Sequence, residues 1–243
     1  MSGPPGTVDV VDDVAAAFAQ TVLTAYAARP GARFVLVLSG GPTARRCYEA
    51  LARAGTDRVD WSQVDIFMGD ERCVAPDDPD ANQRLVREAL IDRVGGVGSF
   101  RPMSCEAGPE AYERLVSEVE AFDVVHLGLG PDGHTASLFP NSAALDAAPG
   151  RLVVRSVDPN DRNPHARMTL TLEGLARALL VVFTVSGVAK HEAFAAVSAG
   201  ADLPAAQVRA RQVLWLVDRE AAGQVGPATA KTPAPTGPAE GDG

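Results

Sequence analysis

The chain has 243 residues, of which 46% are hydrophobic and 22% are charged, and its formal net charge at pH 7 is −9. This is a globular composition, and the length suits one large α/β domain or two small ones. The acidic balance argues against attraction to nucleic acid or to an anionic membrane through overall charge. An anionic ligand would therefore need a local cluster of Arg and Lys.

The three cysteines, Cys47, Cys73 and Cys105, are an odd number without C-x-x-C spacing. They predict free thiols in a reducing compartment and give no support for a zinc site. The uncharged stretch over residues 14–28 is too short to span a bilayer, and aspartates precede it where a signal peptide carries positive charge. We therefore expect a cytoplasmic protein with no membrane partner.

Apolar residues at helical spacing predict a first helix over residues 14–28. In chain order, the pattern then predicts a strand at 34–38, a helix at 43–53, a strand at 64–68, helices at 81–94 and 109–121, strands at 122–127, 152–155, 167–172 and 179–185, a helix at 189–198, a strand at 213–217 and a helix at 219–223. Strands that alternate with helices favour a mostly parallel sheet covered on both faces.

The composition changes near residue 223. From there to residue 243 the chain is rich in Pro, Ala, Gly and Thr and has almost no large apolar residues. Such a segment cannot offset its own ordering entropy. We therefore expect one domain over residues 1–222 and a disordered tail over residues 223–243.

Three unusual loops each follow a predicted strand, so they would meet at the sheet edge where ligands of parallel sheets bind. The first reads Ser39-Gly40-Gly41-Pro42-Thr43. Its glycines permit close approach of the backbone, and the helix start that follows offers free N–H groups and partial positive charge to a phosphate. Ser39 and Thr43 add hydroxyl donors. A plain turn with either hydroxyl as helix cap is an equal alternative.

The second loop, Gly69-Asp70-Glu71-Arg72, has two adjacent carboxylates and a guanidinium. The carboxylates could orient a substrate hydroxyl or a water, and Arg72 could bind a phosphate with two hydrogen bonds. Taken alone, the segment is more simply a solvated loop whose charges neutralise one another.

The third loop contains G-x-G-x-x-G at residues 128–133. A dinucleotide site needs a long helix after the third glycine, and Pro140 limits any helix there to about two turns. The loop instead sets Asp132 beside His134. Histidine titrates near neutrality and suits proton transfer, and a carboxylate can fix its tautomer.

The other candidates are weaker when each is taken alone. His126 lies in an apolar strand and is predicted to be a hydrogen-bonded core residue. His165 and His191 are predicted at the surface, and Arg167 and Lys190 are by default surface charges. The sequence has no G-x-S-x-G elbow, which disfavours a serine hydrolase of the α/β-hydrolase kind.

Together these segments resemble the signature blocks of the 6-phosphogluconolactonases. The matching blocks are residues 39–43, 70–72 with Pro76 and Asn82, 128–140, 167–171, 187–190 and 215–218. The resemblance implies a single-domain Rossmann-like fold, a mostly parallel sheet with helices on both faces. The sequence departs at Pro42, which replaces a serine and cannot donate an N–H, and at Ala81, which replaces a capping serine.

The resemblance also implies roles. His134 becomes a general base oriented by Asp132, and N–H groups near Gly130–Gly133 would hold the oxyanion. The implied substrate or phosphate ligands are Ser39, Gly40, Gly41, Thr43, Asp70, Arg72, Arg167 and Lys190. The implied reaction is hydrolysis of 6-phospho-D-glucono-1,5-lactone to 6-phospho-D-gluconate without metal or cofactor. The sequence does not define an oligomeric state.

Two alternatives stay open. Glucosamine-6-phosphate deaminases share the first and third loops, but they typically have Asp-Glu-Tyr in the second loop and Asn-Glu-Pro after the histidine. This sequence has Arg72 and Leu138-Phe139-Pro140 at those places. The other alternative is a sugar-phosphate-binding protein that lacks catalysis.

Overall fold

The computed structural model describes residues 3–29 and 31–224. The predicted tail lies outside the described residues from residue 225 onward, so its disorder stays a prediction. Its first two residues, Gly223 and Gln224, form a turn in which their N–H groups donate to the carbonyls of Glu220 and Arg219. The helix predicted at residues 219–223 is therefore wrong, because the segment is a turn.

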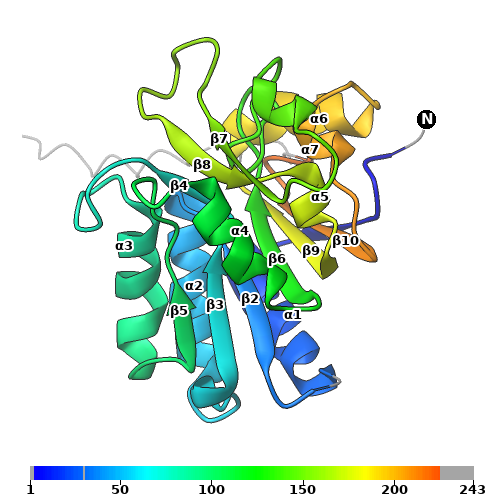
Figure 1. The fold of residues 1–243 in the computed structure, drawn as a ribbon. Coiled ribbons are helices and arrows are strands. Elements are labelled where there is room, and N and C mark those ends of the chain that lie inside the picture. The colour runs from blue at the N-terminus through cyan, green and yellow to red at the C-terminus, as the bar shows by residue number, and fades with distance from the viewer. Residues whose placement is uncertain (1–2, 30, 225–243) are drawn as a thin grey trace, which may run out of the picture.

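A parallel sheet forms the centre of the molecule (Figure 1). In the described residues it has seven strands in the order β1-β10-β9-β6-β2-β3-β5, and every pair of neighbours is parallel. The strands are β1 (Thr7–Val11), β2 (Phe34–Leu38), β3 (Val64–Met68), β5 (Ser99–Arg101), β6 (Phe122–Gly128), β9 (Ala178–Val185) and β10 (Gln212–Asp218). The prediction of a mostly parallel sheet is confirmed. The short strands β1 and β5 were not predicted.

Helices cover both faces of this sheet. In Figure 1, α4 lies in front of the strands and α2 behind them. The helices are α1 (Val14–Ala28), α2 (Pro42–Gly55), α3 (Asn82–Val86), α4 (Pro109–Ser117), α5 (Leu172–Leu175), α6 (His191–Ser198) and α7 (Pro204–Gln207). Short 3₁₀ or π turns are η1 (Trp61–Gln63), η2 (Arg87–Ile91), η3 (Asp92–Val94), η4 (Ala143–Asp146) and η5 (Val188–Lys190). Since β2 is covered on both sides, all five of its side chains are buried, as its unbroken apolar run predicts.

A second, antiparallel sheet lies over the carboxyl ends of the parallel strands (Figure 1). It consists of β4 (Asp70–Arg72), β8 (Arg167–Leu170) and β7 (Val153–Ser156), in that order. The solvated loop that we considered for residues 69–72 is therefore wrong. Residues 70–72 form a strand whose Asp70 pairs with Thr169 of β8. A three-residue strand is too short to show an alternating pattern.

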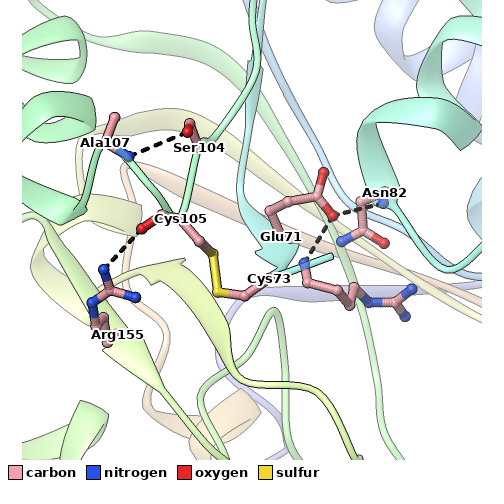
Figure 2. The surroundings of a disulfide bond; sticks show 8 residues. Glu71, Cys73, Asn82, Ser104, Cys105, Ala107 and Arg155 are labelled. Atoms are coloured by element: carbon pink, nitrogen blue, oxygen red, sulfur yellow. Dashed lines mark hydrogen bonds between the residues drawn. A yellow bond between two sulfur atoms is a disulfide. The ribbon is translucent and has the colours of Figure 1, made fainter. Parts of the chain in front are cut away.

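The prediction of three free cysteines is also wrong. Cys73 and Cys105 form a disulfide with Cα atoms 5.4 Å apart, and Cys47 is buried and free. Figure 2 shows the bridge between the end of β4 and the segment before α4. Thirty-two positions separate the two cysteines in sequence. Spacing alone therefore gave no signal, and only the placement of β4 above the sheet brings them together.

This disulfide should stabilise the fold measurably. A cross-link over a loop of this length limits the unfolded chain and is worth about 3–4 kcal/mol. We predict that Cys73→Ser and Cys105→Ser each lower the free energy of unfolding by about this amount. Urea unfolding with and without reductant measures it, and the reductant should not affect either variant. Three free thiols in the unreduced denatured wild type would contradict the bridge.

Candidate active site

A cavity of about 270 Å³ opens where β2, β6 and β9 end. This is near the small end of the range for ligand pockets, so it suits one small molecule. The small antiparallel sheet contributes its far wall through Asp70, Arg72 and Arg167. The lining residues from the predicted set are Ser39, Gly40, Gly41, Thr43, Asp70, Arg72, His134, Arg167 and Lys190. The structure therefore gathers at one cavity residues that are up to 151 positions apart, from Ser39 to Lys190 (190 − 39).

The Gly40-Gly41 turn forms one wall and leads into α2. Gly41 is the N-cap of that helix with φ of 105°, a value that favours glycine, and no side chain caps the helix. The first N–H groups of α2 thus have no internal acceptor, as an anion site requires. At Gly40, an added Cβ would lie 1.7 Å from Asn82 Oδ1, so no larger residue fits between this turn and α3.

His134 and Asp132 form a hydrogen-bonded pair beside the cavity. His134 Nδ1 lies 2.6 Å from Asp132 Oδ1, which also accepts the backbone N–H of His134 at 3.1 Å. This fixes the ring and leaves Nε2 as the imidazole nitrogen free to contact a ligand. Gly130 lies against the ring, because an added Cβ there would be 2.1 Å from His134 Nδ1. The histidine side chain is 18% exposed, which suits contact with a bound molecule.

The charges at this site depend on burial and on their partners. Burial opposes ionisation of Asp132, but its hydrogen bond and charge interaction with His134 prevail and lower its pKa to about 2. Burial lowers the pKa of Lys190, and the charge of Asp132 opposes that effect. Asp132 is thus a fixed negative charge that stabilises positive charge on either neighbour.

Asp70 and Arg167 form a buried pair on the opposite wall. Their side chains are about 5% exposed, and Arg167 Nη1 lies 3.8 Å from Asp70 Oδ2. Ser137 bridges them, since its hydroxyl donates to Asp70 Oδ2 at 2.6 Å and accepts from Arg167 Nη1 at 3.4 Å. Arg167 also donates to Asn163 Oδ1 at 3.1 Å, and its Nε has no partner among the described residues. A buried guanidinium with an unused donor at a cavity wall is suited to an anion.

The three residues of β4 have different functions. Asp70 and Arg72 line the cavity, and Arg72 donates to the carbonyl of Asp80 at 2.5 Å. Glu71 points away and accepts the N–H of Asn82 at 2.7 Å (Figure 2). It also accepts the N–H of Gln83 at 2.8 Å, so both bonds lie at the start of α3. It thereby replaces the cap that the sequence lacks at Ala81, a role that we had not predicted.

Several lining residues were missed in the sequence. Asn163, Thr184 and Ser186 contribute to the cavity wall but belong to no motif that signals a ligand. His126 also contacts the cavity, and it is 1% exposed with both ring nitrogens hydrogen-bonded, which confirms its prediction as a core residue. Within residues 3–29 and 31–224, no group of three His, Cys, Asp or Glu side chains is arranged to hold a metal.

The third loop leaves fewer free N–H groups than the predicted oxyanion site would use. The N–H of Gly130 donates to the carbonyl of His134 at 2.8 Å, and the N–H of Gly133 donates to the carbonyl of Gly130 at 3.0 Å. Both donors close the turn, and Pro131 has no N–H. Of the N–H groups at residues 130–133, that of Asp132 is the one that donates to no backbone carbonyl of the described residues, so it stays available for an oxyanion.

Comparison with known proteins agrees with this geometry. The profile of the glucosamine-6-phosphate isomerases/6-phosphogluconolactonase family matches residues 6–215. The chain belongs to this family. A 6-phosphogluconolactonase of Mycobacterium leprae is 38% identical over 229 residues, which are 85% of this chain and 90% of that protein. One from Synechocystis is 37% identical over 205 residues, 76% of this chain and 82% of that protein.

A solved structure supports the same fold. The 6-phosphogluconolactonase of Thermotoga maritima superposes with a TM-score of 0.76 at 28% identity, covering 87% of this chain and 99% of that one. The Rossmann-like fold predicted from the resemblance is confirmed. In the described part of this chain, no helix has the length and apolar character needed to cross a bilayer.

Proposed function

We propose that this protein hydrolyses 6-phospho-D-glucono-1,5-lactone to 6-phospho-D-gluconate, with His134 as the general base. The observation that carries the proposal is the His134–Asp132 pair at a cavity whose other walls hold Arg72, Arg167 and Lys190. The family relatives named 6-phosphogluconolactonase support the reaction. The role of His134 rests on its geometry and on the chemistry of lactone hydrolysis.

In the proposed mechanism, His134 Nε2 accepts a proton from a water molecule, and the resulting hydroxide adds to the lactone carbonyl. Asp132 keeps Nδ1 as the donor nitrogen and stabilises the imidazolium that forms. The tetrahedral intermediate then collapses with cleavage of the bond to the ring oxygen. The imidazolium returns its proton to that oxygen, so the products are the open carboxylic acid and unchanged enzyme.

The environment of His134 favours a lactonase over a deaminase. The position at which deaminases of this superfamily have a glutamate is Phe139, which is fully buried. Its ring packs 4.8 Å from the ring of His134 and 5.5 Å from the guanidinium of Arg167. An aromatic ring cannot supply the acid–base group that ring opening of an amino sugar would need.

The cationic wall supports recognition of the phosphate. Arg167 has an unused Nε donor, Lys190 is half-buried, and the start of α2 offers backbone N–H groups. Since the chain as a whole is strongly acidic, this local concentration of positive charge needs a function. Binding of a doubly charged phosphate would neutralise this positive charge.

The first prediction of the proposed function concerns His134→Ala. It should lower kcat by about 10²–10⁴-fold while leaving the affinity for 6-phosphogluconate nearly unchanged, because a general base acts in the transition state. Initial rates corrected for spontaneous lactone hydrolysis, together with calorimetric titration, measure both. His165→Ala is the matched control, since it removes an imidazole that pairs with Asp80 outside the cavity. Near-normal turnover in His134→Ala would refute the assignment.

The second prediction of the proposed function concerns the charge of Asp132. Because the pKa of Asp132 is about 2, its carboxylate is ionised at neutral pH, and in the proposed mechanism it stabilises the imidazolium that forms. In Asp132→Asn that stabilisation is lost, so kcat/KM at neutral pH should fall. The lowered pKa also stabilises the fold above the ordinary Asp pKa, an effect lost as pH falls towards 2. An unchanged kcat/KM in Asp132→Asn would exclude the pairing from catalysis.

The third prediction separates phosphate binding from sugar binding. Lys190→Ala should weaken the binding of 6-phosphogluconate by about 1.5–3 kcal/mol, because a charge-assisted contact is lost. The binding of unphosphorylated gluconate should not change. Arg167→Lys should act similarly and is safer than alanine, which would leave Asp70 buried without a cation. Arg209→Ala is a control, because Arg209 is exposed and its hydrogen bonds to described residues go to backbone carbonyls. Equal losses for both ligands would refute the phosphate role.

A further inference from the structure

Ser39 connects β2 to the glycine turn, and its polar groups all form hydrogen bonds with the buried residues Tyr48 and His126. Its N–H donates to Tyr48 Oη at 2.8 Å, and its carbonyl accepts from the same hydroxyl at 2.8 Å. Its own hydroxyl donates to the carbonyl of His126 at 2.8 Å. The Ser39 hydroxyl proton is therefore already used, and the residue acts first as an anchor for the turn that follows.

The anchor extends through His126 to a third strand. His126 Nδ1 lies 2.8 Å from Tyr48 Oη, and Nε2 lies 2.8 Å from Thr184 Oγ1 at the end of β9. Tyr48 is fully buried, His126 is 1% exposed and Thr184 is 3% exposed. Burial lowers the pKa of His126 to about 3, so the ring stays neutral at ordinary pH. One continuous set of hydrogen bonds thus joins α2, β2, β6 and β9.

Counting donors and acceptors assigns the protons. Tyr48 has one hydroxyl proton, and one lone pair of its oxygen accepts the N–H of Ser39. If Tyr48 donates to the Ser39 carbonyl, His126 Nδ1–H must donate to Tyr48, and the Thr184 hydroxyl must donate to Nε2. Every group then has a partner. In the other neutral tautomer Tyr48 donates to Nδ1, and the Ser39 carbonyl loses this donor.

We propose that Tyr48 and His126 are positioning residues that set where the Gly40-Gly41 turn meets the substrate phosphate. This rests on the proposed function, since it deepens the account of the same site. The side chain of Asn82 packs against Gly40, and Gly41 has no side chain that could cap α2. The hydrogen bonds of Ser39 are therefore the polar contacts that hold the start of this turn in place. Thr184 lines the cavity, and once its proton is donated to His126 its oxygen can accept from a sugar hydroxyl or a water but cannot donate to the phosphate.

The chain contains a matched control in Tyr112. This buried tyrosine accepts the N–H of Met68 at 2.7 Å and donates to the Met68 carbonyl at 3.0 Å, the same contact that Tyr48 makes with Ser39. Tyr112 is absent from the cavity wall, and its third contact is a backbone carbonyl, that of Arg101. Tyr112→Phe therefore removes an equivalent buried hydroxyl at the neighbouring strand without contact to His126 or the glycine turn.

The test compares Tyr48→Phe, His126→Leu and His126→Asn with Tyr112→Phe. We expect Tyr48→Phe to weaken the binding of 6-phosphogluconate and of inorganic phosphate about tenfold, the equivalent of one buried hydrogen bond. The affinity for gluconate should not change. With the lactone substrates, KM for the phosphorylated form should rise by a similar factor while kcat changes little. His126→Leu should match Tyr48→Phe. His126→Asn should restore part of the affinity, because its amide reaches Tyr48 Oη but not Thr184.

Melting temperatures separate positioning from stability. Tyr48→Phe and Tyr112→Phe should both lower the melting temperature, but only Tyr48→Phe should lose phosphate affinity. Equal losses of affinity in both, or none in Tyr48→Phe, would overturn the proposal, as would equal losses for phosphorylated and unphosphorylated ligands. If the wild type bound 6-phosphogluconate but did not hydrolyse the lactone, the proposed function would fail, and the affinity comparison would still decide the role of Tyr48.

Discussion

The strands of the central sheet all run in one direction in the described residues, and the site depends on this constraint. Because parallel strands leave the sheet at one edge, the glycine turn after β2 and the histidine loop after β6 open into the same cavity. Each loop alone has an ordinary structural interpretation. Their meeting at one edge brings the hydrogen-bonded His134–Asp132 pair, the first N–H groups of α2 and several cationic side chains to a single small cavity.

The small antiparallel sheet adds the wall that the parallel sheet cannot supply. It sets Asp70 on β4 opposite Arg167 on β8 and buries both charges. Burying an ion pair is expensive in free energy and is often no more stable than an apolar contact. Burial indeed lowers the pKa of Arg167, and the charge of Asp70 opposes that effect. Among the described residues the pair also leaves the Nε donor of Arg167 without a partner, at a wall of the cavity.

The residues around the site divide between contact and support. His134 and Lys190 border the cavity directly, whereas Glu71 acts from behind by capping α3 (Figure 2). Tyr48 and His126 support the cavity floor in the same way, with hydrogen-bonding groups that are all directed inward. A site that must hold its donors within a fraction of an ångström needs this second layer, because side chains without partners would move.

The sequence alone determined the local features. The unbroken apolar run of β2 specifies a strand buried on both faces, and the pairing of Asp132 with His134 follows from a spacing of two residues across Gly133, whose φ is 82°. Only the tertiary structure decided the Asp70–Arg167 pair, the cap that Glu71 gives to α3, and the bond between Cys73 and Cys105. The physical reason is range: local contacts depend on neighbours along the chain, whereas distant contacts depend on where each strand leaves the sheet.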